Sequence, residues 1–378
     1  MTRTPPAYYD DRVRPVILLV LAACGSSAPE MPGGDAGADA ARSDAATPAH
    51  VVAYISGYGP AIAWFDVDLT TGALAPKGSL AAAQPSFLAL SPSHVYAVSE
   101  NMDRVGAYAV DPASGALTFL DDRASGGAGP AHVAIDRSGA YVLVANYGGG
   151  TAAVLPIAAD GSLEPATQTV SPGANAHMIV TDAANRFAFV PCKGSDYVAQ
   201  YTFDHGVLAA NAIPHLATAA GAGPRHLAFA PDGKHGYLVD ETASTLMVLG
   251  YDATSGRLTP QQTISTRAAG ATGANTGAEV AVSTSGAFVY ASNRGDDDIA
   301  VFAIAADGSV TFASHTPTGG ATPRMFALDP TGRWLYAANQ GSNTVVAFAV
   351  DPVTGGLTPT GAVTQATMPA FVGFVALP

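Results

Sequence analysis

Short, mostly apolar runs of strand-forming residues, separated by polar turns, recur along most of the chain from Val51 onward. Two examples are Thr344–Val350 (Thr-Val-Val-Ala-Phe-Ala-Val) and Ile299–Ile304 (Ile-Ala-Val-Phe-Ala-Ile), each followed within a few residues by Asp and Gly. A period of two residues, bounded by turn-forming residues, is typical of short antiparallel strands. The pattern therefore predicts an all-β chain.

The turns between these runs repeat. The form Asp-x-x-x-Gly-x-Leu occurs four times, first at Asp68–Leu74, and three shortened copies such as Asp160–Leu163 (Asp-Gly-Ser-Leu) bring the number to seven. Their glycines are 43 to 52 residues apart and lie at Gly72, Gly115, Gly161, Gly206, Gly256, Gly308 and Gly355. Self-similarity at such a period indicates a repeat architecture.

Six repeats also contain an upstream pair of strands, as in Arg324–Asn339. The seventh is split, because its first strand is Pro369–Val375 at the C-terminus and its other strands come from Val51–Leu74. One blade built from both ends of the chain closes a ring, whereas a solenoid needs polar capping repeats. We predict a seven-bladed β-propeller of four-stranded antiparallel blades.

Composition narrows the possible partners. The 378 residues are 48% hydrophobic and 12% charged, with 41 glycines and a formal net charge of −13. This excludes a disordered tail or a coiled coil, and an acidic chain without a Lys/Arg-rich run is not expected to bind nucleic acid. Cys24 and Cys192 are the two cysteines, so we expect no disulfide framework and no thiolate zinc site.

The N-terminal segment has the features of an export signal. Arg12 and Arg14 precede the apolar run Pro15–Ala23, which as a helix is too short to span a bilayer. Leu21-Ala-Ala-Cys24 resembles a bacterial lipoprotein box; the alternative is an ordinary signal peptide. We expect a signal peptide at 1–23, a lipidated Cys24 with a flexible acidic linker at 24–50, and the propeller domain at 51–378. The protein would be exported and held by lipid on the periplasmic side of a membrane or at the cell surface.

Polar residues concentrate where the first strand of each blade begins and the second ends, two positions that share one face of a propeller. Those before the turn are His132, His177, Arg225, His226, Glu279 and Arg324. Those after it are Glu100, Asn146, Lys193, Asp240, Glu241, Asn293, Arg294, Asn339 and Gln340. Acids and cations at one mouth suit an anionic substrate and proton transfer. Asparagines at blade ends commonly satisfy backbone groups, so we interpret Asn146, Asn293 and Asn339 as structural.

The sequence lacks the motifs of several other enzyme classes. The sequence contains neither a Gly-x-Ser-x-Gly elbow, nor a P-loop, nor His-Glu-x-x-His, nor an EF-hand loop. Asp296–Asp298 is interpreted as a solvated turn, and Cys192 as an inert thiol.

At these positions the chain resembles the seven-bladed propeller lactonases, a family with bacterial 6-phosphogluconolactonase and fungal carboxy-cis,cis-muconate cyclase. The resemblance spans Val51 to the C-terminus. It rests on Val144–Gly150, Gly223–Phe229, Ala291–Asp297 and the region from Pro323 to Gln340. It implies a metal-independent site made of His177, Arg225, Glu241 and Arg294.

Two departures from the family pattern flank this site. Pro191-Cys-Lys-Gly194 stands where the family commonly has Pro-Asp-Leu-Gly, and Asp240-Glu241 where it has Asn-Glu. We expect them to alter substrate preference. The remaining mouth residues are assigned to substrate binding: His132, His226, Glu279, Arg324, Lys193 and Glu100.

The hypothesis is an exported hydrolase of a sugar-derived or similar anionic lactone, without cofactor. Glu241 or His177 would act as general base on water, while Arg225 and Arg294 hold the anionic group and the oxyanion. Two alternatives stay open: a lipid-tethered binding propeller without catalysis, and a muconate-type cycloisomerase.

Overall fold

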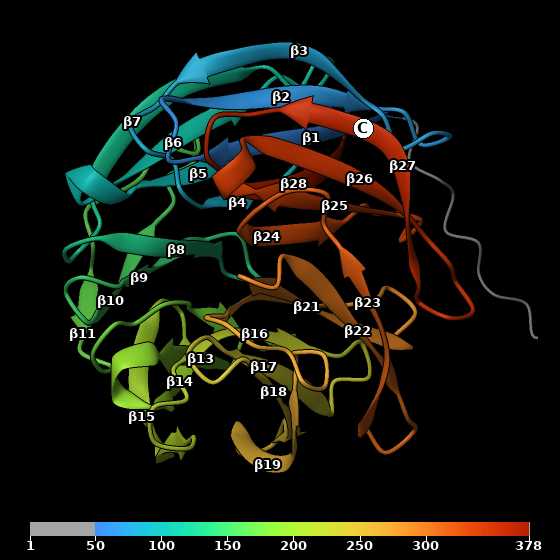
Figure 1. Cartoon of the computed structure of the whole chain (residues 1–378). Helices are drawn as coiled ribbons and strands as arrows, with labels where there is room; N and C mark the ends of the chain where they lie inside the picture. Colours follow the sequence, from blue (N-terminus) through green and yellow to red (C-terminus); the bar gives the residue numbers. More distant parts are fainter. Residues whose placement is uncertain (1–49, 378) are drawn as a thin grey trace, which may run out of the picture. The chain divides into compact units, whose positions relative to one another are not determined.

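The computed structural model describes residues 50–377, which form seven four-stranded antiparallel sheets arranged around a common centre (Figure 1). The expectations for the signal peptide, Cys24 and the linker up to residue 49 fall on residues that it does not describe. The predicted fold is confirmed. In the described part of the chain no helix is long and apolar enough to cross a membrane.

The first three blades follow one another in the chain. Blade 1 consists of β4 (Leu88–Leu90), β5 (His94–Ser99), β6 (Arg104–Val110) and β7 (Leu117–Ala124), with helix η1 (Glu100–Met102). Blade 2 consists of β8 (Pro130–Ile135), β9 (Tyr141–Asn146), β10 (Thr151–Pro156) and β11 (Gln168–Val170). Blade 3 consists of β12 (Val180–Thr181), β13 (Phe187–Cys192), β14 (Tyr197–Asp204) and β15 (Val207–Ala217), with helix η2 (Lys193–Ser195).

The next three blades repeat the arrangement. Blade 4 consists of β16 (Pro224–Phe229), β17 (His235–Asp240), β18 (Thr245–Asp252) and β19 (Arg257–Ser265). Blade 5 consists of β20 (Thr276–Val282), β21 (Phe288–Arg294), β22 (Asp298–Ile304) and β23 (Val310–Pro317). Blade 6 consists of β24 (Pro323–Leu328), β25 (Trp334–Asn339), β26 (Thr344–Val350) and β27 (Leu357–Gln365), with helix η3 (Gln340–Ser342).

The closing blade joins the two ends of the described chain, as predicted. Its strands are β28 (Pro369–Leu377), β1 (His50–Gly57), β2 (Ala61–Val67) and β3 (Leu74–Ala81), in that order. β28 and β1 pair along eight residues, from His50 opposite Leu377 to Gly57 opposite Pro369.

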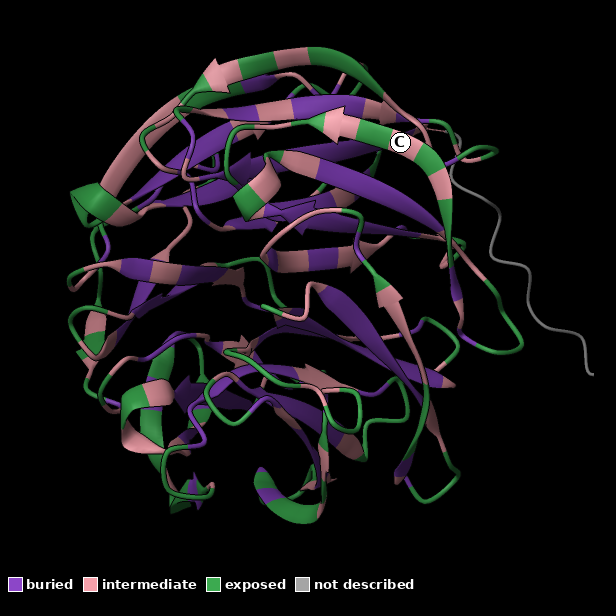
Figure 2. Ribbon diagram, viewed as in Figure 1, coloured by how far each residue is buried: buried purple, intermediate pink, exposed green. Residues whose placement is uncertain are grey.

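The core lies between blades. Each of the seven hydrophobic clusters contains side chains from two neighbouring blades, so every pair of adjacent blades shares one. Inner strands such as β1 are buried along almost their whole length, whereas in outer strands such as β27 exposed residues alternate with half-buried ones (Figure 2). Third strands such as β22 and β26 are also mostly buried, which explains why their sequences are nearly continuous apolar runs.

The seven turn glycines are contact points between blades. Each lies against the second strand of the preceding blade, so a Cβ atom would meet a side chain there at 2.8 Å or less. The glycine and side-chain pairs are Gly72 with Trp334, Gly115 with Val52, Gly161 with His94, Gly206 with Tyr141, Gly256 with Phe187, Gly308 with His235 and Gly355 with Phe288. All seven have positive φ, between 69° and 84°. The recurrence of glycine is therefore a packing requirement as well as a turn requirement.

Four of these contacts include a hydrogen bond from a buried tyrosine to the glycine carbonyl. The donors are Tyr54 to Gly115 (2.7 Å), Tyr96 to Gly161 (3.0 Å), Tyr237 to Gly308 (3.0 Å) and Tyr290 to Gly355 (3.1 Å). Between blade 6 and the closing blade, the equivalent Tyr336 hydroxyl is buried without a partner. There the Trp334 indole Nε1 donates to the Leu69 carbonyl at 3.1 Å instead.

Candidate active site

Irregular strand pairing places the polar residues at the channel mouth. The register shifts after the first residue of β8, β16 and β24 and after the second residue of β20, so that one or two residues bulge out of the ladder. Arg225, Glu279 and Arg324 occupy such bulges, which re-aim side chains near active sites. The second strands deliver Glu241, Lys193 and Arg294 at or just after their ends.

Glu241 is the centre of the upper layer of the site. Its Oε1 atom lies 2.7 Å from Lys193 Nζ and 3.2 Å from Arg294 Nη2, and its Oε2 atom lies 3.2 Å from Arg225 Nε. His177 Nε2 faces the same Oε2 at 4.0 Å. Burial opposes ionisation, but Arg225, Arg294 and Lys193 together lower the pKa of the Glu241 carboxyl. Glu241 is therefore a carboxylate clamped by three cations.

Backbone carbonyls of blade 5 fix the two arginines. Arg225 Nη1 donates to the Ala278 carbonyl at 2.5 Å, and Arg294 Nη2 donates to the Gly277 carbonyl at 3.1 Å. Arg225 is 97% buried, and burial together with Arg294 and Arg324 lowers its pKa. Two rigid guanidinium groups beside one pocket can receive a carboxylate, a phosphate or a developing oxyanion.

A second, deeper layer consists of histidines and one acid. His226 Nδ1 lies 3.0 Å from Glu279 Oε2, and Glu279 Oε1 accepts the Val280 N–H at 3.1 Å. The His177 and His226 rings are 5.0 Å apart, and His132 is 5.7 Å from His226. Burial lowers the pKa of all three histidines well below its ordinary value, so they are neutral at pH 7. Burial also raises the pKa of Glu279 to about 7.

The third part of the mouth faces the closing blade. The Arg324 guanidinium lies 5.1 Å from the centre of the Tyr58 ring and makes no ion pair with any residue in 50–377. Burial raises the pKa of Tyr58, and Glu100, as its hydrogen-bond partner, raises it further. Glu100 Oε2 is buried without a partner.

The structure thus brings the ten predicted site residues to one mouth in three connected groups. Sequence reasoning missed three aromatic residues there. Tyr58 and Tyr147 follow second strands at the register of Glu241, so the same register argument could have found them. Phe87, whose ring lies 4.3 Å from His132, has no such signal because an apolar residue beside an inner strand resembles core.

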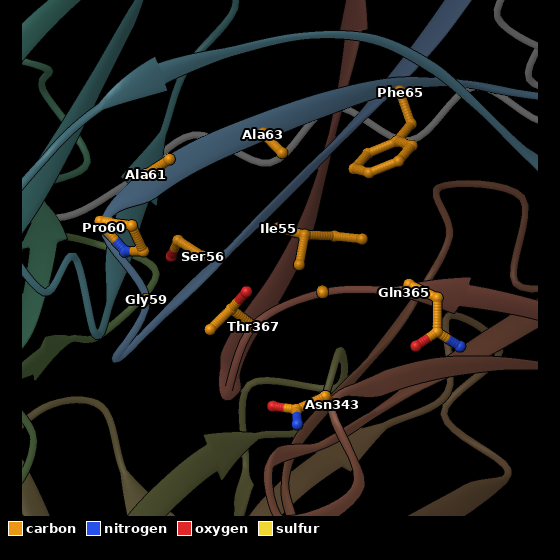
Figure 3. A pocket seen from close by; sticks show the side chains of 11 residues that line it. Ile55, Ser56, Gly59, Pro60, Ala61, Ala63, Phe65, Asn343, Gln365 and Thr367 are labelled. Atoms are coloured by element: carbon orange, nitrogen blue, oxygen red, sulfur yellow. The ribbon is translucent and has the colours of Figure 1, made fainter.

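Cavity size alone does not locate the site. The mouth pocket has a volume of about 10 Å³ and is lined by Ser86, Phe87, Ala131, His177, Arg225, His226, Glu279, Arg324, Met325 and Ala370. Two grooves of about 400 Å³ lie between blades. No charged side chain lines the one between the closing blade and blade 6 (Figure 3), and in the other Arg104 and Asp122 pair with each other. Clustered, perturbed ionisable groups favour the mouth.

The structural interpretation of the blade-end asparagines is confirmed. Their Nδ2 atoms donate to a carbonyl of the preceding blade: Asn146 to Ser125 (2.9 Å), Asn293 to Thr266 (2.8 Å) and Asn339 to Thr318 (3.1 Å). Cys192 is also as predicted, because burial raises the pKa of its thiol to about 12.

Asp240 occupies the equivalent position in blade 4. Its Oδ2 atom accepts the Thr245 hydroxyl at 2.8 Å, and its Oδ1 atom is buried without a partner. Burial raises the pKa of this carboxyl to about 6. Unlike asparagine, an ionised carboxylate cannot donate to the carbonyl of the neighbouring blade.

Comparison with known proteins agrees with this fold. A family model described as "Lactonase, 7-bladed beta-propeller" matches residues 49–374. A 6-phosphogluconolactonase of Bacillus subtilis is 32% identical over 287 residues, covering 72% of this chain and 82% of that protein. The solved structure of a periplasmic gluconolactonase, PpgL, of Pseudomonas aeruginosa has a TM-score of 0.82 at 30% identity, covering 87% of this chain and all of that one. A structure from Lactobacillus plantarum has a TM-score of 0.80 at 32% identity, covering 86% and 99%.

Proposed function

Because the chain belongs to the seven-bladed β-propeller lactonase family and is a lactone hydrolase of the 6-phosphogluconolactonase type, we propose that its substrate is a sugar-derived or similar anionic lactone. Its role would lie in carbohydrate metabolism. The relatives' substrates support this choice, since one is named for a phosphorylated sugar lactone and another for gluconolactone.

The excess of cations at the mouth is the observation on which this proposal rests. Lys193, Arg225, Arg294 and Arg324 gather there in a protein of formal net charge −13. Glu241 engages three of them, and Arg324 is free of carboxylates among the described residues. A local positive potential in an acidic protein concentrates an anionic ligand. A phosphate or carboxylate on the lactone is therefore the group expected to bind here.

Of the two predicted bases, His177 has the more suitable environment. Glu241 is a poor proton acceptor, because three cations stabilise its ionised form. His177 is neutral at pH 7 and so has a lone pair free to accept a proton, although burial and Arg225 lower its pKa. The Glu241 carboxylate, 4.0 Å from Nε2, is the group that would offset this by stabilising the imidazolium. In this mechanism Glu241 orients His177 and the arginines.

The proposed hydrolysis has two steps, addition of water and opening of the lactone ring. The water oxygen adds to the lactone carbonyl carbon while a water proton passes to His177, and Arg225 and Arg294 stabilise the resulting oxyanion. The intermediate then collapses, the ring C–O bond breaks, and the imidazolium returns the proton to the leaving oxygen. The hydroxy acid product ionises and releases one proton per turnover.

Proton release therefore tests the proposal. A pH-stat assay of the purified chain would compare 6-phosphogluconolactone, gluconolactone and muconolactone with their spontaneous rates. We expect Arg225→Ala and Glu241→Ala to lose about 10²- to 10³-fold in rate. Arg333→Ala, which removes an exposed arginine in the turn before β25, at the other end of that strand from the mouth, is the matched control. Full activity in both site variants would contradict the assignment.

The two alternatives make different predictions in the same assay. No acceleration of any lactone, with binding retained, would support a tethered binding propeller. Turnover of a muconate without net water uptake would support cycloisomerisation.

We also propose export and lipid anchoring through Cys24. Support comes from the apolar run Pro15–Ala23 followed by the lipobox-like Leu21-Ala-Ala-Cys24, and from the periplasmic origin of the Pseudomonas relative. Membrane fractionation of cells expressing the wild type and Cys24→Ala tests this: the variant should leave the membrane fraction.

A further inference from the structure

Three residues that line the mouth pocket each have a buried polar atom without a partner. Ser86 Oγ, His177 Nδ1 and His226 Nε2 have no hydrogen-bond partner within residues 50–377, and the three residues line one cavity of about 10 Å³. They are 95%, 96% and 99% buried. An unmet polar atom at such depth is destabilising by about 1–3 kcal/mol, so partners are expected.

The cavity has the dimensions and lining of a single-water site. A buried water occupies roughly 10–15 Å³ on this measure and makes two to four hydrogen bonds. The surrounding side chains are too close together for a sugar ring to enter, so a lactone must bind above the pocket, among the cations.

We infer that Ser86, His177 and His226 bind one water molecule below the lactone, that this water is the nucleophile, and that Glu279 is the positioning residue that orients His226 toward it. The inference rests on the proposed hydrolysis. It changes the roles of His226 and Glu279, which sequence reasoning had assigned to substrate binding, and it adds Ser86 to the site.

Carboxylates on the far sides of the two rings, one 4.0 Å from His177 and one hydrogen-bonded to His226, select the atoms that face the water. His177 Nε2 faces the Glu241 carboxylate, which favours the tautomer with hydrogen on Nε2 and leaves Nδ1 as an acceptor. His226 Nδ1 bonds Glu279 Oε2 at 3.0 Å, so Nδ1–H donates to ionised Glu279 and Nε2 is likewise an acceptor. The water then donates one hydrogen to each imidazole and directs a lone pair at the carbonyl carbon above. His177 accepts the proton as the new C–O bond forms.

The protonation of Glu279 should control this arrangement. When Glu279 is protonated it donates to His226 Nδ1, the hydrogen moves to Nε2, and the water loses one acceptor. Burial raises the pKa of Glu279 to about 7, with Arg225 and His132 opposing. The groups around the pair are Arg225 on β16, His132 on β8, Arg294 on β21, Arg324 on β24, and Glu241 after β17. We therefore expect kcat to rise with pH through about 7.

Two kinds of experiment test the inference. A high-resolution crystal structure of the wild-type protein should show one ordered water within hydrogen-bond distance of Ser86 Oγ, His177 Nδ1 and His226 Nε2. In kinetics, Ser86→Ala should lower kcat about tenfold with KM unchanged, the loss expected for one hydrogen bond to the nucleophile. Glu279→Gln should remove the rise of kcat through pH 7.

Ser56→Ala is the matched control. Ser56 is 98% buried and its Oγ atom also has no partner, but it lines the separate groove between the closing blade and blade 6 (Figure 3). Its removal should leave kcat, KM and the pH profile unchanged.

The outcomes separate this inference from the proposed function. Lactone hydrolysis by the wild type, combined with an empty pocket or with normal kcat and pH profile in Ser86→Ala and Glu279→Gln, would overturn the inference alone. A wild type that binds the water but accelerates no lactone would overturn the proposed function, and with it the water's role as nucleophile.

Discussion

Replacing Asp240 with Asn should stabilise the protein at neutral and basic pH. The three asparagines at equivalent blade ends each donate to a carbonyl of the preceding blade, and Asp240 has no hydrogen to donate once it is ionised. In sequence order the equivalent carbonyl belongs to Thr218, the residue after β15. Asparagine would supply the missing donor and remove a buried charge.

The pKa of Asp240 sets the magnitude. Burial raises it from 3.8 to about 6, so the folded state holds its proton to higher pH than the unfolded state. The free energy of unfolding is therefore highest, as far as Asp240 is concerned, below about pH 4, and it falls as the pH rises from about 4 through 6. A difference of about two units corresponds to about 3 kcal/mol in the free energy of unfolding. The new hydrogen bond would add about 1 kcal/mol.

Guanidinium unfolding at pH 4 and pH 8 measures the effect. Asp240→Asn should gain about 3–4 kcal/mol at pH 8 and about 1 kcal/mol at pH 4. Asp204→Asn, at a side chain that is 86% exposed, should change little at either pH. An equal gain at both pH values, or a loss at pH 8, would refute the reasoning.

Three further predictions concern substrate preference, packing and metal dependence. Lys193→Leu should raise KM for 6-phosphogluconolactone about tenfold more than KM for uncharged gluconolactone, because one cation leaves the mouth; equal KM changes would exclude a role in anion binding. Gly256→Ala should cost about 2 kcal/mol or more in thermal unfolding, since its Cβ would lie 2.1 Å from the Phe187 ring. Gly233→Ala, with similar φ but nothing within 4 Å, should cost only about 1 kcal/mol. Lactone hydrolysis should survive dialysis against EDTA, because in the proposed mechanism His177 takes the water proton and Arg225 and Arg294 stabilise the oxyanion; a loss restored by a divalent ion would contradict this.

The fold was predictable because its defining contacts are local and repeated. The turn glycines mark every blade, and the blade shared between the two chain ends follows from counting the repeats. Trp334 over Gly72 shows why the pattern is strict: a larger residue at the turn would collide with the neighbouring blade.

The strand register predicts which residues lie at the mouth, but not which side chains contact one another there. Register places Lys193, Glu241 and Arg294 at one mouth, but it does not show that both cations contact the same carboxylate oxygen. That pairing depends on side-chain rotamers and on bulges such as the one at Arg225, which leave no mark in the hydrophobic pattern. For the same reason the Glu279–His226 contact could not be read from the sequence.

The pairing of β1 with β28 brings His50 and Leu377 side by side, so the described chain begins and ends at neighbouring points of a closed ring. A short peptide could join these two points, and the chain could be cut instead at an exposed turn of another blade, giving a circular permutant with the same blades in the same order. The natural break lies in the blade whose contact with blade 6 lacks the tyrosine hydrogen bond. In a permutant opened elsewhere, the four strands of the closing blade would follow one another in the chain. Its free energy of unfolding would show how much of the ring's stability depends on the position of the chain ends.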